Sequence, residues 1–184
     1  MSERFDRALE QIVAVDRDHL EELRYGEHMA AKLGEFAPDA SEALELAARA
    51  QHVGRWKIPR SDYPMDRAGY KRWRTNLANL HAETAGEILR NVGYPQETVL
   101  RTQSLIRKKN LKTDPECQTL EDVICLVFLE HYLADFAKKH DEPKLVSILQ
   151  RSWVKMSDKG QRAALDLDLP EDLKQLVGRA LAAA

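Results

Sequence analysis

The sequence is poor in the features that mark secreted, membrane-spanning or β-rich proteins. Its two cysteines, Cys117 and Cys125, form no CxxC pair, which excludes a disulfide framework and fits a reducing compartment. No apolar stretch is long enough for a signal peptide or a membrane span. No segment alternates polar and apolar residues with the period of two that is typical of a strand. We therefore expect an all-α, cytoplasmic protein with no membrane partner.

The chain also lacks an excess of charge of either sign, because 28 lysines and arginines face 30 aspartates and glutamates. The protein as a whole is thus no general binder of polyanions, and any nucleic-acid role depends on a local patch. The chain has 184 residues, of which 43% are hydrophobic, so it can bury a core of its own. We expect a single helical domain over residues 1–184.

Apolar residues recur at helical spacing along almost the whole chain and predict a compact bundle of seven to nine helices. The first helix carries a stripe from Phe5 to Leu23 that includes Asp16 and His19, and its polar residues are expected to be exposed. Capping residues, glycine and proline set the limits of the other helices. These helices cover residues 25–36, 42–56, 66–91, 96–109, 120–133, 143–156, 161–167 and a last segment opened by Pro170.

One segment is apolar on nearly every side and predicts the buried centre of the fold. Residues 120–129 run almost without a polar break, and a helix of this kind is surrounded by others. Thr119, with Asp122 three residues later, resembles a capping box that begins this helix. Polar residues bound the run on both sides, so it is too short to cross a bilayer.

Positive charge is concentrated in two segments. Residues 49–74 hold eight lysines and arginines against two aspartates, and residues 101–112 hold five with no acid. The first segment also contains Trp56, Tyr63, Tyr70 and Trp73. Guanidinium groups beside flat aromatic faces suit the binding of phosphates and stacked bases. The alternative is that the aromatic residues face the core while the cations pair with acids elsewhere in the chain.

This basic and aromatic segment predicts a binding site for a phosphorylated, nucleotide-like ligand. Arginines would contact phosphate, Trp56 and Tyr63 would offer a stacking face, and His52 would be a polar anchor. The predicted ligand-binding residues are His52, Arg55, Trp56, Arg60, Tyr63, Arg67 and Arg74. An RNA-associated module is an alternative, in which both basic segments form one face.

Three histidines and one aspartate suggest a further alternative, a metal-dependent enzyme. His28, His52 and His81 fall on separate predicted helices, and Asp122 lies in the first turn of the central helix. This order resembles the helical HD-type phosphohydrolases, whose imidazole and carboxylate groups hold a divalent ion that activates water. The resemblance implies an HD-like fold and Mn, Fe, Ni or Zn bound by these four residues. Val53 stands where that family has an aspartate, so the motif is incomplete.

A structural alternative accounts for the same residues without a metal. His52 and His81 would hydrogen-bond within a helical core, and Asp122 would cap its helix next to Thr119. The cysteines offer little for catalysis, because Cys125 lies in a wholly apolar run and acidic residues surround Cys117.

Five longer strings carry a resemblance that covers nearly the whole chain: RAQHVGRWKIPRSDYPMDRAGYKRWR, LHAETAGEILRNVGY, RKKNLKTDPE, QTLEDVICLVFLEHYLADF and WVKMSDKG. They resemble an uncharacterised family of bacterial and fungal proteins, which is catalogued as a domain of unknown function. Many of its members carry the label glutamyl-tRNA synthetase. The resemblance implies membership of this family but no established activity.

The synthetase label is not supported by the sequence. HVGR at 52–55 and KMSDKG at 155–160 resemble the two signatures with which class I synthetases bind ATP. Those signatures work on loops of a parallel α/β fold, whereas both strings here lie in or beside predicted helices. The chain is also too short for that catalytic domain and a tRNA-binding module. We therefore do not expect aminoacylation.

Overall fold

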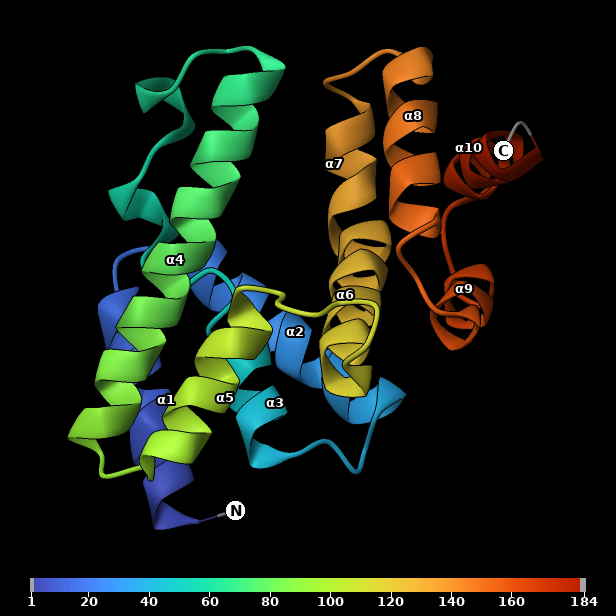
Figure 1. The fold of residues 1–184 in the computed structure, drawn as a ribbon. Helices are drawn as coiled ribbons and strands as arrows, with labels where there is room; N and C mark the ends of the chain where they lie inside the picture. Colours follow the sequence, from blue (N-terminus) through green and yellow to red (C-terminus); the bar gives the residue numbers. More distant parts are fainter. Residues whose placement is uncertain (1, 183–184) are drawn as a thin grey trace. The chain divides into compact units, whose positions relative to one another are not determined.

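The computed structural model describes residues 2–182, which contain ten α-helices and no strand. The prediction of an all-α fold is confirmed. The chain divides into two compact units, one that extends to Asn110 and one that begins at Leu111 (Figure 1). Within residues 2–182, no helix is both long enough and apolar enough to cross a membrane.

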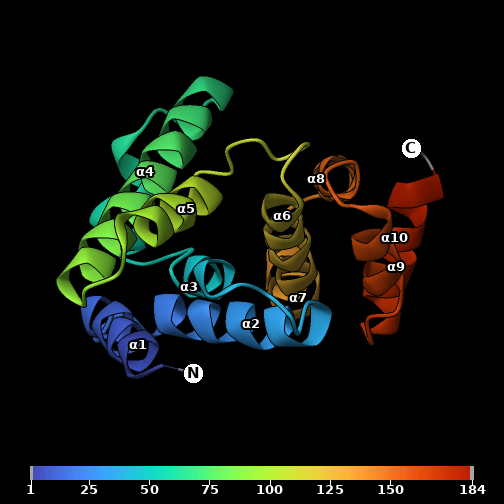
Figure 2. The same ribbon diagram turned by 60° about the horizontal axis from the view of Figure 1, so that its bottom comes forward.

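The first unit packs five α-helices and two short 3-10 turns around an aliphatic core. Its elements are α1 (Glu3–Val15), α2 (Leu20–Phe36), α3 (Glu42–Arg49), η1 (Arg55–Lys57), η2 (Arg60–Asp62), α4 (Arg67–Asn91) and α5 (Gln96–Ile106). Helix α5 packs against both α3 and α4, and α2 packs against α3 (Figures 1 and 2). Leu46, Leu77 and Leu105 are almost completely buried among these helices.

Helix caps place α3 and α4 as the sequence predicts. The side chains of Ser41 and Asp66 each accept a hydrogen bond from the backbone N–H three residues later. Gly93 follows α4 with a φ of 84°, a left-handed conformation that favours glycine. The predicted helix 66–91 is therefore confirmed as α4, with Asp66 as its N-cap.

Four helix boundaries in the first unit differ from prediction. The predicted first helix stops at Val15, and α2 starts at Leu20. Asp16 is only 3% exposed, although the polar residues of this helix were expected to face solvent. The predicted helix 42–56 ends at Arg49, and Gly54 turns the chain with a φ of 68°. Helix α5 ends before residue 109 because Lys108 also takes a positive φ, of 55°.

The second unit is built on one long helical segment. Helix α6 (Pro115–Val127), the π-helical turn η3 (Phe128–Tyr132) and α7 (Leu133–Ala137) follow one another without a loop. The unit is completed by α8 (Glu142–Trp153), α9 (Asp158–Leu165) and α10 (Glu171–Ala182). Helix α9 packs against α6, and α10 packs against α8. The predicted burial of residues 120–129 is confirmed for most of their side chains. The π-helical turn divides the predicted central helix into α6 and α7, so residues 2–182 contain ten α-helices where seven to nine were predicted.

The predicted capping box at Thr119 is wrong. Helix α6 begins earlier, because Pro115 occupies the first turn and the Asp114 carboxylate caps it through the N–H groups of Glu116 and Cys117. Thr119 lies inside the helix, where its hydroxyl donates to the carbonyl of Pro115.

Asp122 joins α6 to α9 rather than capping a helix. Its carboxylate accepts hydrogen bonds from the backbone N–H of Ser157 at 2.8 Å, from the Ser157 hydroxyl at 2.5 Å and from the Gln118 amide at 3.0 Å. The residue is 1% exposed. A Cβ on Gly160 would lie 2.6 Å from Asp122 Cγ, so only glycine allows this close approach.

Replacing Asp122 with alanine leaves several donors without an acceptor at a buried position. We expect Asp122→Ala to lower the free energy of unfolding by about 3 kcal/mol in urea titrations followed by circular dichroism. Asp135→Ala is the matched control, because this exposed carboxylate contacts only the solvent-facing Lys138. It should leave the urea midpoint unchanged, and equal effects of the two substitutions would refute the role given to Asp122.

Candidate functional site

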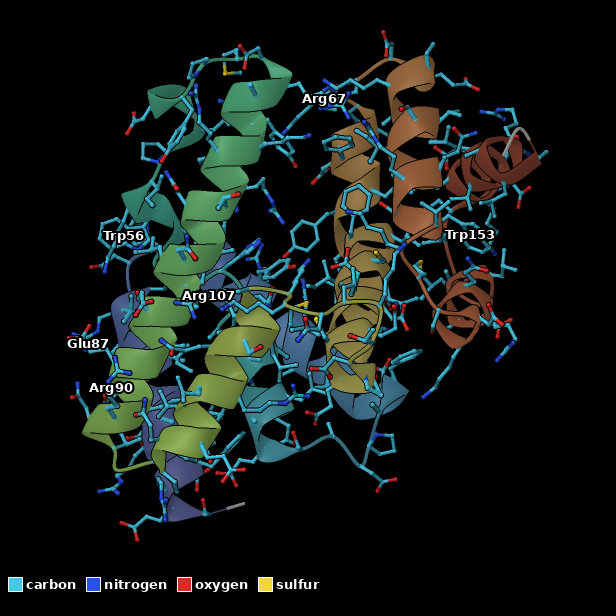
Figure 3. All side chains as sticks on the ribbon, in the orientation of Figure 1. Trp56, Arg67, Glu87, Arg90, Arg107 and Trp153 are labelled. Carbon is cyan, nitrogen blue, oxygen red and sulfur yellow. The ribbon has the colours of Figure 1, made fainter. Side chains whose placement is uncertain are left out.

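The turn after α3 is held in place by the buried carboxylate of Asp16. Its Oδ1 accepts the backbone N–H of Gly54 at 2.9 Å and the indole N–H of Trp56 at 3.0 Å. Burial raises the pKa of Asp16, while these two hydrogen bonds and the nearby positive charges oppose that rise. The His19 ring stacks on Trp56 with centroids 4.3 Å apart, and Figure 3 marks the indole. Trp56 was predicted as a stacking face for a ligand. In the structure it already stacks against the ring of His19.

Arg60 and Tyr63 fasten the following loop. Arg60 donates from Nη1 to the carbonyl of Tyr63 at 2.9 Å and from Nη2 to the carbonyl of Pro64 at 2.8 Å. The Tyr63 hydroxyl accepts from the Asn76 amide of α4 at 2.8 Å. Both residues were predicted to contact a ligand, but the hydrogen bonds of Arg60 and Tyr63 are made within the fold.

Arg55 differs from Arg60, because part of its guanidinium has no acceptor. Its Cζ lies 4.7 Å from the centroid of the Trp73 ring, whose own N–H donates to the carbonyl of Ile58 at 2.9 Å. Its Nη1 is the one buried side-chain nitrogen or oxygen in residues 2–182 that makes no hydrogen bond to the protein. Burial lowers the pKa of Arg55, and the positive charge of Arg74 lowers it further. A buried donor without an acceptor lowers the free energy of unfolding.

Two neutral histidines lie beside this guanidinium. His52 stacks on Tyr25 with ring centroids 3.5 Å apart, and its ring lies 6.0 Å from that of His81. Nδ1 of His81 lies 2.7 Å from the carbonyl oxygen of Val53. Burial lowers the pKa of His81 to about 4, and burial followed by the charge of Arg55 lowers the pKa of His52 well below its usual range. A neutral His81 must donate its Nδ1–H to that carbonyl, which leaves a lone pair on Nε2.

Cations from three elements act on this pair of rings. After burial, the pKa of His52 is lowered by Arg55 of η1, by His81 and Arg74 of α4, and by Lys108 after α5. We call His52, Arg55, Arg74, His81 and Lys108 the Arg55 cluster. The one carboxylate that raises the pKa of Arg55 is Glu22, and it forms neither a hydrogen bond nor an ion pair with that guanidinium. The cluster thus gathers cations around a guanidinium that has no ion pair with Glu22.

The remaining predicted basic residues are arranged differently. Arg67 is the exposed first residue of α4 (Figure 3). Arg107, at the end of α5, forms an ion pair with Glu83 and donates to Asn79 Oδ1 at 3.2 Å. Of the second basic segment, therefore, Lys108 joins the Arg55 cluster, whereas Arg107 is neutralised within the fold.

The predicted metal ligands are not gathered into a metal site. Across the part of the chain that the structure describes, no group of three or more histidine, cysteine, aspartate or glutamate side chains could hold a metal ion. His52 and His81 are neighbours, and His28 lies on α2. Asp122 belongs to the second unit, where its carboxylate accepts hydrogen bonds from Ser157 and Gln118. The metal hypothesis therefore has no supporting ligand cluster in residues 2–182.

The two strings that resemble synthetase signatures have structural roles. In HVGR, Val53 accepts from His81 and Gly54 donates to Asp16. In KMSDKG, Ser157 caps α9 and binds Asp122. Both strings lie in helical surroundings, with no strand in residues 2–182. A nucleotide-binding α/β sheet, which those signatures require, is not formed by this part of the chain.

Sequence reasoning missed three residues that shape the site, namely Asp16, Tyr25 and Lys108. Asp16 interrupts the apolar stripe of its predicted helix, and a carboxylate at a core-facing position is a signal for a specific partner. Tyr25 gave no such signal, and Lys108 was indicated only as one of five cations in residues 101–112.

The two arginines over Trp73 should respond oppositely to substitution by methionine. Arg55→Met removes an unpaired buried charge and keeps the apolar contact, so we expect the free energy of unfolding in chloride buffer to rise by about 1 kcal/mol. Arg60→Met breaks two hydrogen bonds to loop carbonyls and should lower it by about 1–2 kcal/mol. Urea titration measures both, and a loss of stability in Arg55→Met as large as that in Arg60→Met would show that Arg55 is a structural residue.

Comparison with known proteins identifies a family without assigning an activity. A search of curated proteins and a search of solved structures each found no match. The model of the domain of unknown function DUF4202 matches residues 5–177, which include all of the Arg55 cluster and nearly all of the chain. On that match, the chain belongs to the DUF4202 family.

Proposed function

We propose that this protein binds a phosphorylated small molecule through the Arg55 cluster. The observation that carries the proposal is the buried Nη1 of Arg55, for which the chain supplies no acceptor. An anionic oxygen bound there would satisfy this donor and neutralise the repulsion between Arg55 and Arg74.

The cluster fits a phosphoryl group because its cations come from separate elements. Arg55 lies in η1, Arg74 in α4 and Lys108 beyond the end of α5. A phosphate carries several equivalent oxygens, and donors from different directions can bind more than one of them. Arg74 is exposed, so a ligand can reach the cluster from solvent on that side.

The surroundings of Arg55 limit its movement before any ligand arrives. Its guanidinium lies on the Trp73 ring, and Asp16 fixes the backbone of the same turn through Gly54. Such a preorganised donor loses little conformational entropy when it binds an anion.

An aromatic face near the cluster supports a nucleotide-like ligand. Tyr70 is 50% exposed, and its ring centroid lies 5.8 Å from that of Trp73, on which Arg55 rests. Because His19 stacks on Trp56, Tyr70 is the better platform for a base in this segment.

The proposal predicts that phosphate stabilises the protein through Arg55. At constant ionic strength, exchanging chloride for inorganic phosphate or AMP should raise the thermal midpoint, because a ligand that binds only the folded state stabilises it. Arg55→Met and Arg74→Met should weaken binding at least about tenfold, measured by calorimetric titration.

Arg72→Met is the matched control, since Arg72 lies on the same helix, is exposed and is not part of the cluster. This variant should bind as the unmodified protein does. Equal weakening in Arg55→Met and Arg72→Met, or no difference between phosphate and chloride, would refute the proposal. Binding of an RNA oligonucleotide without binding of phosphate or AMP would favour the RNA alternative instead.

A further inference from the structure

The Arg55 cluster combines a buried donor with two imidazole rings that are both able to accept a proton. His52 makes no hydrogen bond or ion pair with the described protein and rests on the Tyr25 ring. His81 has one nitrogen engaged with the carbonyl of Val53, so its Nε2 is the nitrogen that remains for a proton. An anion bound to Arg55 would therefore lie in the vicinity of two basic nitrogens.

We propose that this site takes up one proton together with its anion, and that the His52–His81 pair holds that proton. The inference rests on the proposed function and adds the coupling between anion binding and protonation. Its physical basis is a reversal of local charge. Without an anion, Arg55 and Arg74 oppose a positive charge on either ring, whereas a bound dianion next to Arg55 would attract one.

The pair should hold one proton rather than two, because the rings lie only 6.0 Å apart. A charge on His81 lowers the pKa of His52, so protonation of one ring opposes protonation of the other. The proton then belongs to the pair as a unit, and the ring that carries it depends on the position of the anion.

Other charged and titratable groups also act on the pair or on Arg55. They include Glu22 and Tyr25 of α2, Arg55 of η1, Tyr70 and Arg74 of α4, and Lys108. Glu22 is the one carboxylate among these named groups, so its replacement by glutamine is the control for proton uptake outside the pair.

The direction of the pH dependence follows from the His81 pKa of about 4 without a ligand. Above pH 7 neither form of the protein holds the extra proton, and affinity for a dianion should not change with pH. As the pH falls below the raised pKa of the complex, affinity should increase by up to tenfold per unit, and it should level off near pH 4.

Sulfate is the probe for this test, because it stays a dianion through this range and every proton taken up must then be on the protein. Calorimetric titrations at pH 5.5 in two buffers with different ionisation enthalpies give the number of protons taken up. We expect about one proton for the unmodified protein and a number near zero for the double variant His52→Gln/His81→Gln. Glu22→Gln and His140→Gln should keep the full uptake, because Glu22 has no hydrogen bond to Arg55 and the contacts of His140 are with Phe136 and Lys144.

A second readout avoids variants whose fold could be disturbed. In the unmodified protein, the ring proton signals of His52 and His81 can be followed by NMR against pH, with and without sulfate. Sulfate should raise at least one of the two apparent pKa values by more than about two pH units, because uptake of about one proton at pH 5.5 requires a pKa above 5.5 in the complex. Sulfate binding with no proton uptake and no such shift would overturn this inference and leave the anion site intact. No binding of sulfate or phosphate by the unmodified protein would overturn the proposed function itself.

Discussion

The geometry of the candidate site depends on one buried carboxylate. Asp16 lies just after α1, accepts the N–H groups of Gly54 and Trp56, and so ties the end of the first helix to the turn that carries His52 and Arg55. Burial of a carboxylate is unfavourable unless hydrogen bonds compensate, and here the bonds come from the turn itself. The turn is thereby held with Arg55 on Trp73 rather than free in solvent.

Two arginines of the same segment differ in whether the fold satisfies their hydrogen bonds. Both guanidinium groups lie over Trp73. Arg60 donates hydrogen bonds to two loop carbonyls, whereas Nη1 of Arg55 is buried and has no acceptor in the protein. Positive charge alone does not separate the two, because they have similar neighbours in the sequence. The distinction comes from the hydrogen bonds, which only the structure shows.

The parts of the fold that follow from local spacing could be predicted, and those that follow from distant contacts could not. Apolar periodicity was enough to predict α4, and the continuous apolar run predicted the burial of α6. The carboxylate of Asp122 suggested a cap, but its partner Ser157 lies 35 residues away and could not be inferred from spacing.

The same division applies to the site. The clustering of arginines and aromatic residues indicated residues 49–74 as a candidate site, and the structure places Arg55 and Arg74 of that segment close enough for their charges to interact. The contribution of Lys108 was not foreseen, since the charge of a residue beyond the end of α5 could equally stabilise that helix terminus. Trp56 and Tyr63 were predicted as a stacking face, yet their partners His19 and Asn76 belong to the protein.

The most direct test of this account observes the guanidinium of Arg55 itself. Nitrogen-15 NMR spectra of the arginine side chains, recorded while inorganic phosphate is added at constant ionic strength, report which guanidinium gains an acceptor. The account predicts that the Nη signals of Arg55 shift first and saturate, with Arg74 following and Arg60 unchanged. Uniform, non-saturating shifts of exposed arginines such as Arg67 and Arg72, with none at Arg55, would contradict it.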